Sequence, residues 1–462
     1  MYIIGEENEK RKCELMKEKH IFSNQDLKKL LLPLMLEQLL NSLMGMVDTM
    51  MVSTVGSAAI SAVSLVDSIN ILIIQAFAAL AAGGTILCSQ YIGSGSKEKA
   101  KEAAAQVVLA ITVLSLAVTG VCLWFRIPLL QFIFGEVEAD VMRNSQTYFL
   151  ITGLSFPFIA LYNCGAAIFR AQKNTKTPLK ISIISNGLNI VGNACLIYGA
   201  GMGVAGAAIA TLGSRIFSAV VVMWLLRNPS CELAVRGYHK IRPDWTCIRQ
   251  IFKIGIPSGI ENSMFQLGKL AIQSTVSMLG TVAIAAQAMT NTLEALDSVL
   301  AIGIGVGMMT VVGQCIGAGR DDEAKYYIKK LTLWAEAAMI CNCLAVFALT
   351  RPVTILGDME PASAAMCFRM MLVITIVKPI AWVPSFIPAY GMRAAGDVKF
   401  SMAVSCCSMW LFRVSLAVLL CRYTNIGPMG VWVAMFTDWT VRAGIFFWRY
   451  RSGRWLQHKV IG

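Results

Sequence analysis

Two short stretches decide the fold: QYIGSGSKEKA, residues 90–100, and QCIGAGRDDEA, residues 314–324. Both carry the pattern Gln-x-Ile-Gly-x-Gly, and they lie 314 − 90 = 224 residues apart. The same offset relates further positions: Pro33 and Pro257, Glu37 and Glu261, Gly56 and Gly280, and Gly206 and Gly430. A register kept over so much of the chain indicates an internal duplication. Each Gly-x-Gly is expected to end a long helix and form a turn, because glycine is favoured there.

The composition indicates a membrane protein. The 462 residues are 56% hydrophobic and only 15% charged, whereas a soluble domain carries about 25% charged residues. About 20 apolar residues cross a bilayer as a helix, and lipid offers the backbone no other hydrogen-bond partners. Twelve windows are long enough: 30–54, 58–86, 104–125, 145–168, 179–198, 203–226, 254–279, 282–312, 331–349, 364–390, 400–421 and 428–448.

The duplication divides these spans into two lobes. We expect an all-α membrane protein with twelve transmembrane helices in two six-helix lobes. Because each half has an even number of spans, the halves are parallel repeats, which place substrate between them and rock against each other. The predicted parts are a cytoplasmic tail 1–28, an N-terminal lobe 29–227, a cytoplasmic linker 228–253, a C-terminal lobe 254–449 and a cytoplasmic tail 450–462.

The net charge of +13 follows the topology rather than a nucleic-acid surface. Lysines and arginines gather in the loops after even-numbered spans. The loops after odd-numbered spans hold few: Arg126, Arg143, Arg351, Arg369 and Arg422. This positive-inside pattern predicts that both termini are cytoplasmic and that the protein lies in a bacterial cytoplasmic (inner) membrane. We therefore expect no nucleic-acid partner.

Little in the sequence favours an enzyme or a cofactor. The fourteen cysteines lie mostly in apolar spans and match no zinc pattern. The three histidines, His20, His239 and His458, lie in the tails and the linker. No phosphate-binding Gly-x-x-x-x-Gly-Lys-Ser/Thr motif is present, so transport must be secondary or driven by a partner.

Several motifs, taken in order, carry a family resemblance. They are VDTMMVSTVG from Val47, the two Gln-x-Ile-Gly loops, NIVGNACLIYGAGMGVAGAAIAT over 189–211 and IPSGIEN from Ile256. With these motifs the chain resembles the multidrug and toxic compound extrusion (MATE) family of cation antiporters. The resemblance implies two six-helix lobes in a V and a secondary antiporter that exports organic cations or drugs in exchange for sodium ions or protons. The two-lobe repeat favours a functional monomer.

The first span carries a candidate coupling site. Asp48 is predicted near the middle of this span, and a charge at membrane depth costs about 2.5–3.5 kcal/mol, which favours a functional role. The resemblance implies a cation site made by this Asp, by Asn-x-x-x-Asp in span 5 and by a Thr in span 6. Asn189 and Thr211 match, but Asn193 replaces the second carboxylate. A sodium ion at Asp48 or a proton therefore both stay open, and interhelical hydrogen bonding is the alternative for the two asparagines.

Two glutamates occupy equivalent places in the repeats. Glu37 and Glu261 each follow a proline by one turn, where the proline frees a backbone carbonyl. A carboxylate and a carbonyl could bind a cation together. The alternative is that both glutamates face water near the cytoplasmic interface.

The C-terminal lobe departs from the family pattern. The resemblance implies acids in spans 7, 8 and 10, and span 8 offers Glu294 and Asp297 on one helical face. Span 10 has Lys378 instead of an acid. Lys378 or Lys269 could pair with Glu294, Asp297 or Glu261. The remaining intramembrane charges are expected to pair locally or to reach the interface: Asp67, Arg215, Glu336, Arg413, Asp438 and Arg442.

These cations keep one rival open. A lipid-linked oligosaccharide flippase of the same superfamily would favour a cationic cavity for pyrophosphate, as Lys269, Lys378 and Arg413 could provide. The Val-Asp-Thr and Asn-x-x-x-Asn matches argue against it. An intramembrane enzyme would need a histidine or paired aspartates within the spans, and histidine is absent there.

Overall fold

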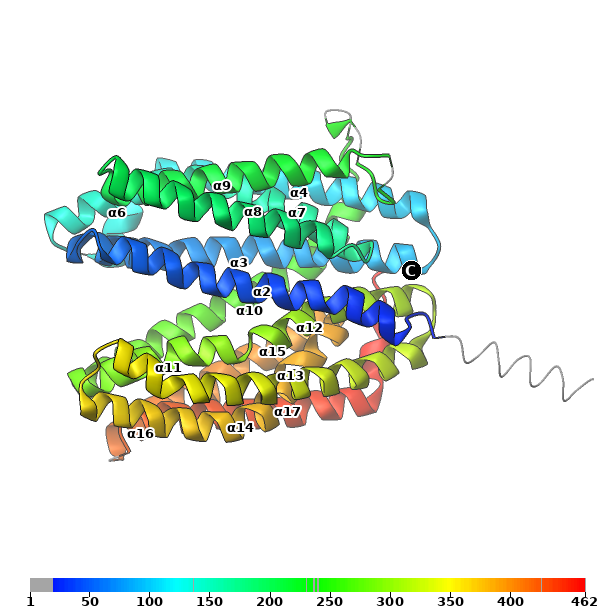
Figure 1. Ribbon diagram of the computed structural model, residues 1–462. Helices are drawn as coiled ribbons and strands as arrows, with labels where there is room; N and C mark the ends of the chain where they lie inside the picture. The colour runs from blue at the N-terminus through cyan, green and yellow to red at the C-terminus, as the bar shows by residue number, and fades with distance from the viewer. Residues whose placement is uncertain are drawn as a thin grey trace, which may run out of the picture.

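The computed structural model describes residues 20–135, 137–229, 231–235, 237–238, 241–424 and 426–461. Every regular element in these ranges is helical. Most of the predicted tail 1–28 lies outside them. The helices run roughly parallel in two layers, with the N-terminal lobe above the C-terminal lobe (Figure 1). The beginning of α2 and the C-terminus lie at the same end, here called the terminal end; the opposite end is called the distal end.

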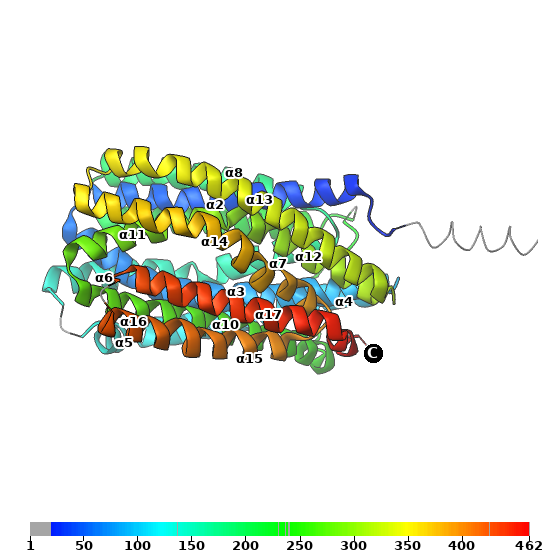
Figure 2. The same cartoon turned by 90° about the horizontal axis from the view of Figure 1, so that it is seen from below.

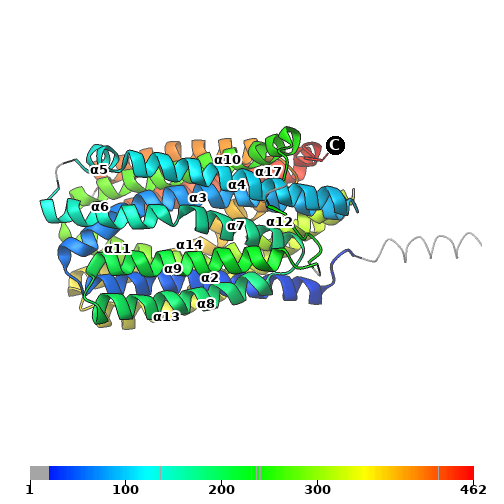
Figure 3. The same cartoon turned by 90° about the horizontal axis from the view of Figure 1, so that it is seen from above.

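The N-terminal lobe begins with a capped helix. Ser23 caps the first helix and forms a capping box with Asp26. The elements of this lobe are α2 (Asn24–Ser53), α3 (Ser57–Gly93), α4 (Lys97–Trp124), α5 (Arg126–Phe134), α6 (Ala139–Leu154), α7 (Phe156–Ala171), α8 (Lys176–Asn193), the π-helix η1 (Ala194–Gly199) and α9 (Gly203–Leu226). Figure 3, from above, shows α4, α8 and α9 on the outside of this layer.

The C-terminal lobe repeats this order. Its elements are α10 (Trp245–Val276), the 3-10 helix η3 (Ser277–Leu279), α11 (Thr281–Asp297), α12 (Val299–Gly317), α13 (Asp321–Leu356), α14 (Pro361–Ala394), α15 (Val398–Ser408), the π-helix η4 (Met409–Val414), α16 (Ser415–Tyr423), α17 (Met429–Ser452) and η5 (Arg454–Gln457). Figure 2, from below, shows α14, α15 and α17 on the outside of this layer.

The membrane crossings agree with the predicted twelve. In the described part of the chain nine helices are long and apolar enough to span a bilayer, and ten if the bent pair α6 and α7 forms one span. The two further helices are α10 and α17. Both carry ionisable residues within their predicted spans, among them Lys269 in α10 and Arg442 in α17. Charged and other polar residues in these two helices, rather than missing helices, therefore account for the difference between the counts.

Two spans predicted as continuous helices are broken. Span 4 bends by 42° between α6 and α7. Pro157 lies in the first turn of α7 and has no backbone N–H to form a helical hydrogen bond with the preceding turn. Span 8 breaks at Ser298, between α11 and α12. Asn342 of α13 donates to the carbonyl oxygens of Leu296 (2.6 Å) and Asp297 (2.9 Å) at this break, so side-chain hydrogen bonds replace helical ones.

The lobes meet through a symmetric contact at the terminal end. Gln90 Nε2 donates to the carbonyl oxygen of Ala394 (2.7 Å), and Gln314 Nε2 donates to that of Ala171 (2.9 Å). Gly93 lies directly against the backbone of Gln314, and Gly317 lies against that of Gln90. We call Gln90, Gly93, Gln314 and Gly317 the inner seam. The two predicted loops therefore join the lobes about the repeat axis.

Toward the distal end the lobes part. Gly83 packs on Ile251 and Gly255, and further out Asn262 Nδ2 donates to Gln75 Oε1 (3.4 Å). In the described ranges no hydrogen bond or ion pair joins the lobes on the distal side of this pair. The lobe-facing stripe of α10 continues through exposed residues, Lys269 and Gln273. In the described residues, hydrogen bonds therefore join the lobes from the terminal end as far as mid-helix and not beyond it.

Candidate functional site

The four N-terminal site residues predicted from the sequence lie together. Asn193 Nδ2 donates to Asp48 Oδ1 (2.8 Å) and contacts Asn189 Oδ1 (3.3 Å). Asn189 Nδ2 in turn donates to Thr211 Oγ1 (3.3 Å). The chain of hydrogen bonds thus links α2, α8 and α9. Asn189 and Asn193 are buried.

Asp48 lies nearer to one end of its helix than the sequence predicted. α2 begins six residues before the predicted window, and Asp48 lies five residues before the end of the helix at Ser53. The carboxylate is therefore in the distal part of α2, not near its middle. Hydropathy marks the apolar length of a span, but the cap at Ser23 sets where the helix starts.

The helical geometry changes next to Asn193. α8 changes to the π-helix η1 directly after Asn193. Such π segments occur inside helices at functional sites, where they alter the direction of side chains. Asn193 Oδ1 is buried and accepts no hydrogen bond from any residue that the structure describes. An amide oxygen, a carboxylate and a hydroxyl are then available as hard oxygen ligands.

A second carboxylate, Asp67 of α3, completes this cluster. Asp67 Oδ1 accepts hydrogen bonds from Asn70 Nδ2 (3.1 Å) and the Tyr148 hydroxyl (3.3 Å). Asp48 interacts electrostatically with both Asp67 and Arg215. The sequence argument placed Asp67 and Arg215 among locally paired charges. The signal that could have found them is the cost of burying any charge at membrane depth.

Glu37 and Glu261 do not face water, so that alternative was wrong. Both are buried, and each accepts a hydrogen bond at 2.8 Å, from Arg170 and Arg393 respectively. The glutamates are 224 residues apart and the arginines 393 − 170 = 223, so the two ion pairs are repeat mates. Each pair joins helices within one lobe. Their other carboxylate oxygens lack a hydrogen-bond partner among the described residues.

In the C-terminal lobe one lysine lies within ion-pair distance of both predicted acids. Lys378 Nζ lies 2.5 Å from Glu294 Oε1 and 3.8 Å from Asp297 Oδ2, and it donates to the Glu294 carbonyl oxygen (2.6 Å). Asp297 is fully buried. Lys269 forms no ion pair with any described residue, although it interacts electrostatically with Glu294. This lobe therefore does not offer an uncompensated pair of carboxylates.

A charged triad lies deeper in the same lobe. Arg413 Nη2 lies 2.8 Å from Asp438 Oδ2, and Arg442 Nη2 lies 3.0 Å from Asp438 Oδ1. The Arg442 guanidinium also lies over the rings of Phe265 (4.9 Å) and Phe386 (4.6 Å). Both arginines therefore have anionic and aromatic partners.

The N-terminal cluster is not duplicated. Under the offset of 224, its positions correspond to apolar or cationic residues of the second half: Asp48 to Ile272, Asn189 to Arg413, Asn193 to Ala417 and Thr211 to Met435. The duplication preserved the seam and the glutamate–arginine pairs but not this site. The two lobes therefore have different chemistry at equivalent positions.

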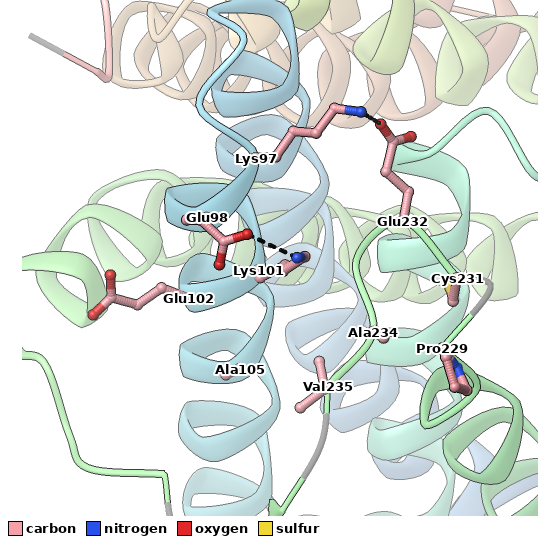
Figure 4. Close-up of a pocket in the computed structure, with 10 residues that line it drawn as sticks. All are labelled: Lys97, Glu98, Lys101, Glu102, Ala105, Pro229, Cys231, Glu232, Ala234 and Val235. Carbon is pink, nitrogen blue, oxygen red and sulfur yellow. Dashed lines mark hydrogen bonds and ion pairs between the residues drawn. The ribbon is translucent and has the colours of Figure 1, made fainter.

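A pocket at the terminal end is lined by partly exposed ion pairs rather than by buried polar groups. It has a volume of about 800 Å³ and lies between the start of α4 and the segment after α9 (Figure 4). Lys97 Nζ pairs with Glu232 (3.2 Å) and Lys101 Nζ with Glu98 (2.8 Å). These partly exposed pairs contribute at most about 1 kcal/mol each. The pocket lies at the opposite end from Asp48, and in the described residues no group of three His, Cys, Asp or Glu side chains could hold a metal ion.

Comparisons with known proteins agree with this organisation. The MatE family model matches residues 33–195 and 257–419, so its two matches begin 224 residues apart. An uncharacterized transporter, YisQ of Bacillus subtilis, is 28% identical over 92% of this chain and 93% of its own length. The probable multidrug resistance protein NorM of Thermotoga maritima is 26% identical over 95% and 94%.

Solved structures share the fold. An outward-facing conformation of a multidrug resistance MATE family transporter superposes with a TM-score of 0.83, at 20% identity, over 93% of this chain and 96% of that one. A transporter from Pyrococcus furiosus, whose binding pocket is described as having reverse polarity, gives a TM-score of 0.82 at 20% identity over 92% and 95%. The two-lobe arrangement of twelve helices is therefore shared with these proteins.

Proposed function

Because the chain belongs to the MatE family of transporters, we propose that it is a secondary antiporter that exports organic cations in exchange for sodium ions or protons. The family is one of transporters rather than enzymes, and relatives named as multidrug resistance proteins point to organic compounds as cargo. The observation that carries the proposal is the hydrogen-bonded cluster of Asp48, Asn189, Asn193 and Thr211.

The cluster has the chemistry of an ion-coupling site. Asp48 supplies the negative charge that attracts either a drug cation or a coupling ion. For sodium, Asp48, the free Oδ1 of Asn193 and the Thr211 hydroxyl would be the ligands, since hard cations prefer oxygen. For protons, Asp48 would be the site that protonates and Asp67 its charged neighbour. In either case ion and drug compete for one carboxylate.

Alternating access would proceed by rocking of the two lobes, which separates the inner seam in the inward-open state. The basic residues of the terminal end favour a cytoplasmic location for that end, so the present arrangement corresponds to an outward-open state. Opening inward requires the bonds from Gln90 to Ala394 and from Gln314 to Ala171 to break. Exporting a monovalent cation against a hundredfold gradient costs about 2.7 kcal/mol. A second coupling ion would add about 2.3 kcal/mol per 100 mV of membrane potential.

The test is ethidium efflux from proteoliposomes under a sodium gradient and, separately, a proton gradient. We expect one gradient to drive efflux in the wild type and Asp48→Asn to abolish it. Asp322→Asn, at a fully exposed side chain near the start of α13, is the matched control and should transport normally. No efflux under either gradient from folded wild-type protein would refute the antiporter. Efflux that survives Asp48→Asn would move the coupling site to another acid.

The flippase alternative rests on the positive charge of the C-terminal lobe. Of the three cations on which it was predicted, Lys378 and Arg413 are engaged in ion pairs, which leaves Lys269 alone without an ion pair among the described residues. A fluorescent polyprenyl-pyrophosphate sugar, incorporated in the same liposomes, tests this role. Its translocation without ethidium efflux would favour the flippase.

A further inference from the structure

A groove on the C-terminal lobe is separate from the cluster around Asp48 and from the inner seam. α14 packs against both α13 and α17 and lies between them in the view from below (Figure 2). The groove between these three helices has a volume of about 390 Å³. The side chains that shape it come in pairs from α13, α14 and α17: Lys329 and Leu333, Pro384 and Pro388, and Phe447 and Arg451.

The shape of the groove follows from the residues on each helix. Pro384 and Pro388 are one turn apart and therefore lie on one face of α14, where their short rings leave a recessed floor. Leu333 of α13 and Phe447 of α17 are exposed on the two walls. At the terminal end the Tyr450 hydroxyl of α17 donates to the carbonyl oxygen of Lys325 of α13 (3.0 Å). A hydrogen bond thus joins the walls there, and the groove opens sideways, toward the lipid that surrounds a membrane protein.

The two ends of the groove differ in polarity. α13 runs from the terminal end to the distal end, whereas α17 runs the opposite way (Figure 1). Lys329 precedes Leu333 by four residues, and Arg451 follows Phe447 by four residues. Four residues of helix span about 6 Å, so both cations lie at the terminal side of the groove and both apolar side chains lie about 6 Å nearer mid-helix. The groove therefore has a cationic end and an apolar end.

Both cations are available to a ligand. Lys329 and Arg451 are exposed, and neither forms an ion pair with a described residue. Among the described residues that line the groove there is no aspartate or glutamate. Asp322, an acid in the first turn of α13, pairs instead with Lys325 (3.3 Å). The Arg451 guanidinium lies over the ring of Phe447 at 5.1 Å, which keeps its charge at the edge of the groove.

We propose that this groove binds one anionic phospholipid, with the phosphate between Lys329 and Arg451 and an acyl chain in the apolar end. The terminal end carries the basic loops that predict a cytoplasmic location, and the cytoplasmic leaflet supplies anionic lipids that bind basic pockets between transmembrane helices. A zwitterionic lipid fits less well, because its headgroup brings a cation of its own to the two that are present. The site lies within one lobe and does not depend on the proposed export.

Native mass spectrometry of the purified full chain in detergent measures lipid binding. Phosphatidylglycerol and phosphatidylcholine with the same acyl chains are added separately. We expect the wild type to retain one phosphatidylglycerol in preference to phosphatidylcholine. Lys329→Gln combined with Arg451→Gln should weaken phosphatidylglycerol binding about tenfold or more, since each cation near an anionic lipid contributes to its affinity. Leu333→Trp, which fills the apolar end without a change of charge, should also weaken it.

Two controls separate this site from general attraction of anions. Arg249→Gln combined with Lys253→Gln removes two exposed cations from the terminal part of α10, outside the groove, and should leave phosphatidylglycerol binding as in the wild type. Glycerol phosphate carries the phosphate but no acyl chain, and at equal concentration it should not displace the lipid.

The outcomes decide the proposal. Loss of phosphatidylglycerol in the two groove variants and not in the α10 control, with every protein eluting as a folded species, supports the site. Equal retention of both lipids by the wild type or equal loss in the α10 control overturns it. Unchanged binding in either groove variant, or displacement by glycerol phosphate, overturns it as well.

Discussion

Adding a methyl group at the inner seam should force the lobes apart at the terminal end. In Gly93→Ala the new Cβ would lie 2.8 Å from the carbonyl carbon of Gln314 and would overlap its oxygen. In Gly317→Ala the Cβ would lie 2.7 Å from the carbonyl carbon of Gln90. Both obstacles are backbone atoms, which cannot turn aside as a side chain can.

The magnitude follows from these distances. Non-bonded carbon atoms prefer a separation of about 3.5–4.0 Å, so the two helix ends must move apart by roughly 1 Å. Overpacking of this kind costs about 1–3 kcal/mol. If the penalty falls only on the closed arrangement, it shifts the equilibrium toward terminal-end opening by about 5- to 150-fold, since 1.4 kcal/mol is tenfold.

Hydrogen exchange followed by mass spectrometry measures this shift directly. We expect faster exchange of the amides near the inner seam, in residues 86–94 and 310–318, in Gly93→Ala and again in Gly317→Ala. Gly120→Ala is the matched control, because a Cβ at Gly120 meets nothing within 4 Å. Exchange at wild-type rates in both seam variants, with the fold intact, would refute the proposal that this contact holds the lobes closed.

Three further perturbations test the buried polar groups and the first helix. Glu37→Gln leaves its partly buried arginine partner without a countercharge and should lower the melting temperature in detergent, by less than the loss of about 3–5 kcal/mol typical of a fully buried pair. Glu98→Gln, in an exposed pair, should change the melt little, and equal melts would contradict the structural role of the Glu37 pair. Asn193→Asp supplies the carboxylate missing from the family pattern and should increase the pH dependence of efflux; an unchanged pH profile would show that position 193 does not contact the coupling ion. Asp26 precedes the predicted first span, 30–54, and its side-chain hydrogen bond with Ser23 lowers its pKa below the ordinary 3.8. The contribution of Asp26 to the free energy of unfolding is therefore present above pH 3.8 and is lost as the pH falls through the lower pKa of the folded state. Asp26→Asn should then reduce the loss of stability on the acid side of a stability-versus-pH curve. A curve for the variant that runs parallel to the wild-type curve would contradict this.

The architecture could be predicted because it depends on local and periodic signals. Apolar length marks a span whatever its neighbours are, and the offset of 224 between Gln90 and Gln314 reveals the repeat without any contact being known. The residues of the cluster around Asp48 could also be predicted, because they match the family's motifs in the same order along the chain. Its place along α2 was predicted less well, because a hydropathy window does not show how far a helix extends beyond its apolar part.

The partners of buried charges were harder to find. Arg170 and Arg393 lie at the ends of spans and count as loop cations in a topology argument, yet each pairs with a buried glutamate of another helix. Such pairing depends on how helices pack, which one sequence does not specify. The 223-residue spacing of the arginines, one less than that of the glutamates, was the one available signal. That Glu294 pairs with Lys378 and not with Lys269 likewise depends on how α11 packs against α14.

The inner seam has a consequence for the history and mutability of the chain. Each half presents both a glutamine donor and a glycine surface to the other, so the contact is isologous, as in a dimer with two-fold symmetry. A single six-helix unit that presented this surface would have been complementary to its own copy before the two units were fused. After fusion, a substitution changes one side only, and the halves can diverge. Asn189 and Arg413, which occupy equivalent positions in the two halves, differ in this way, whereas the seam residues are the same in both halves.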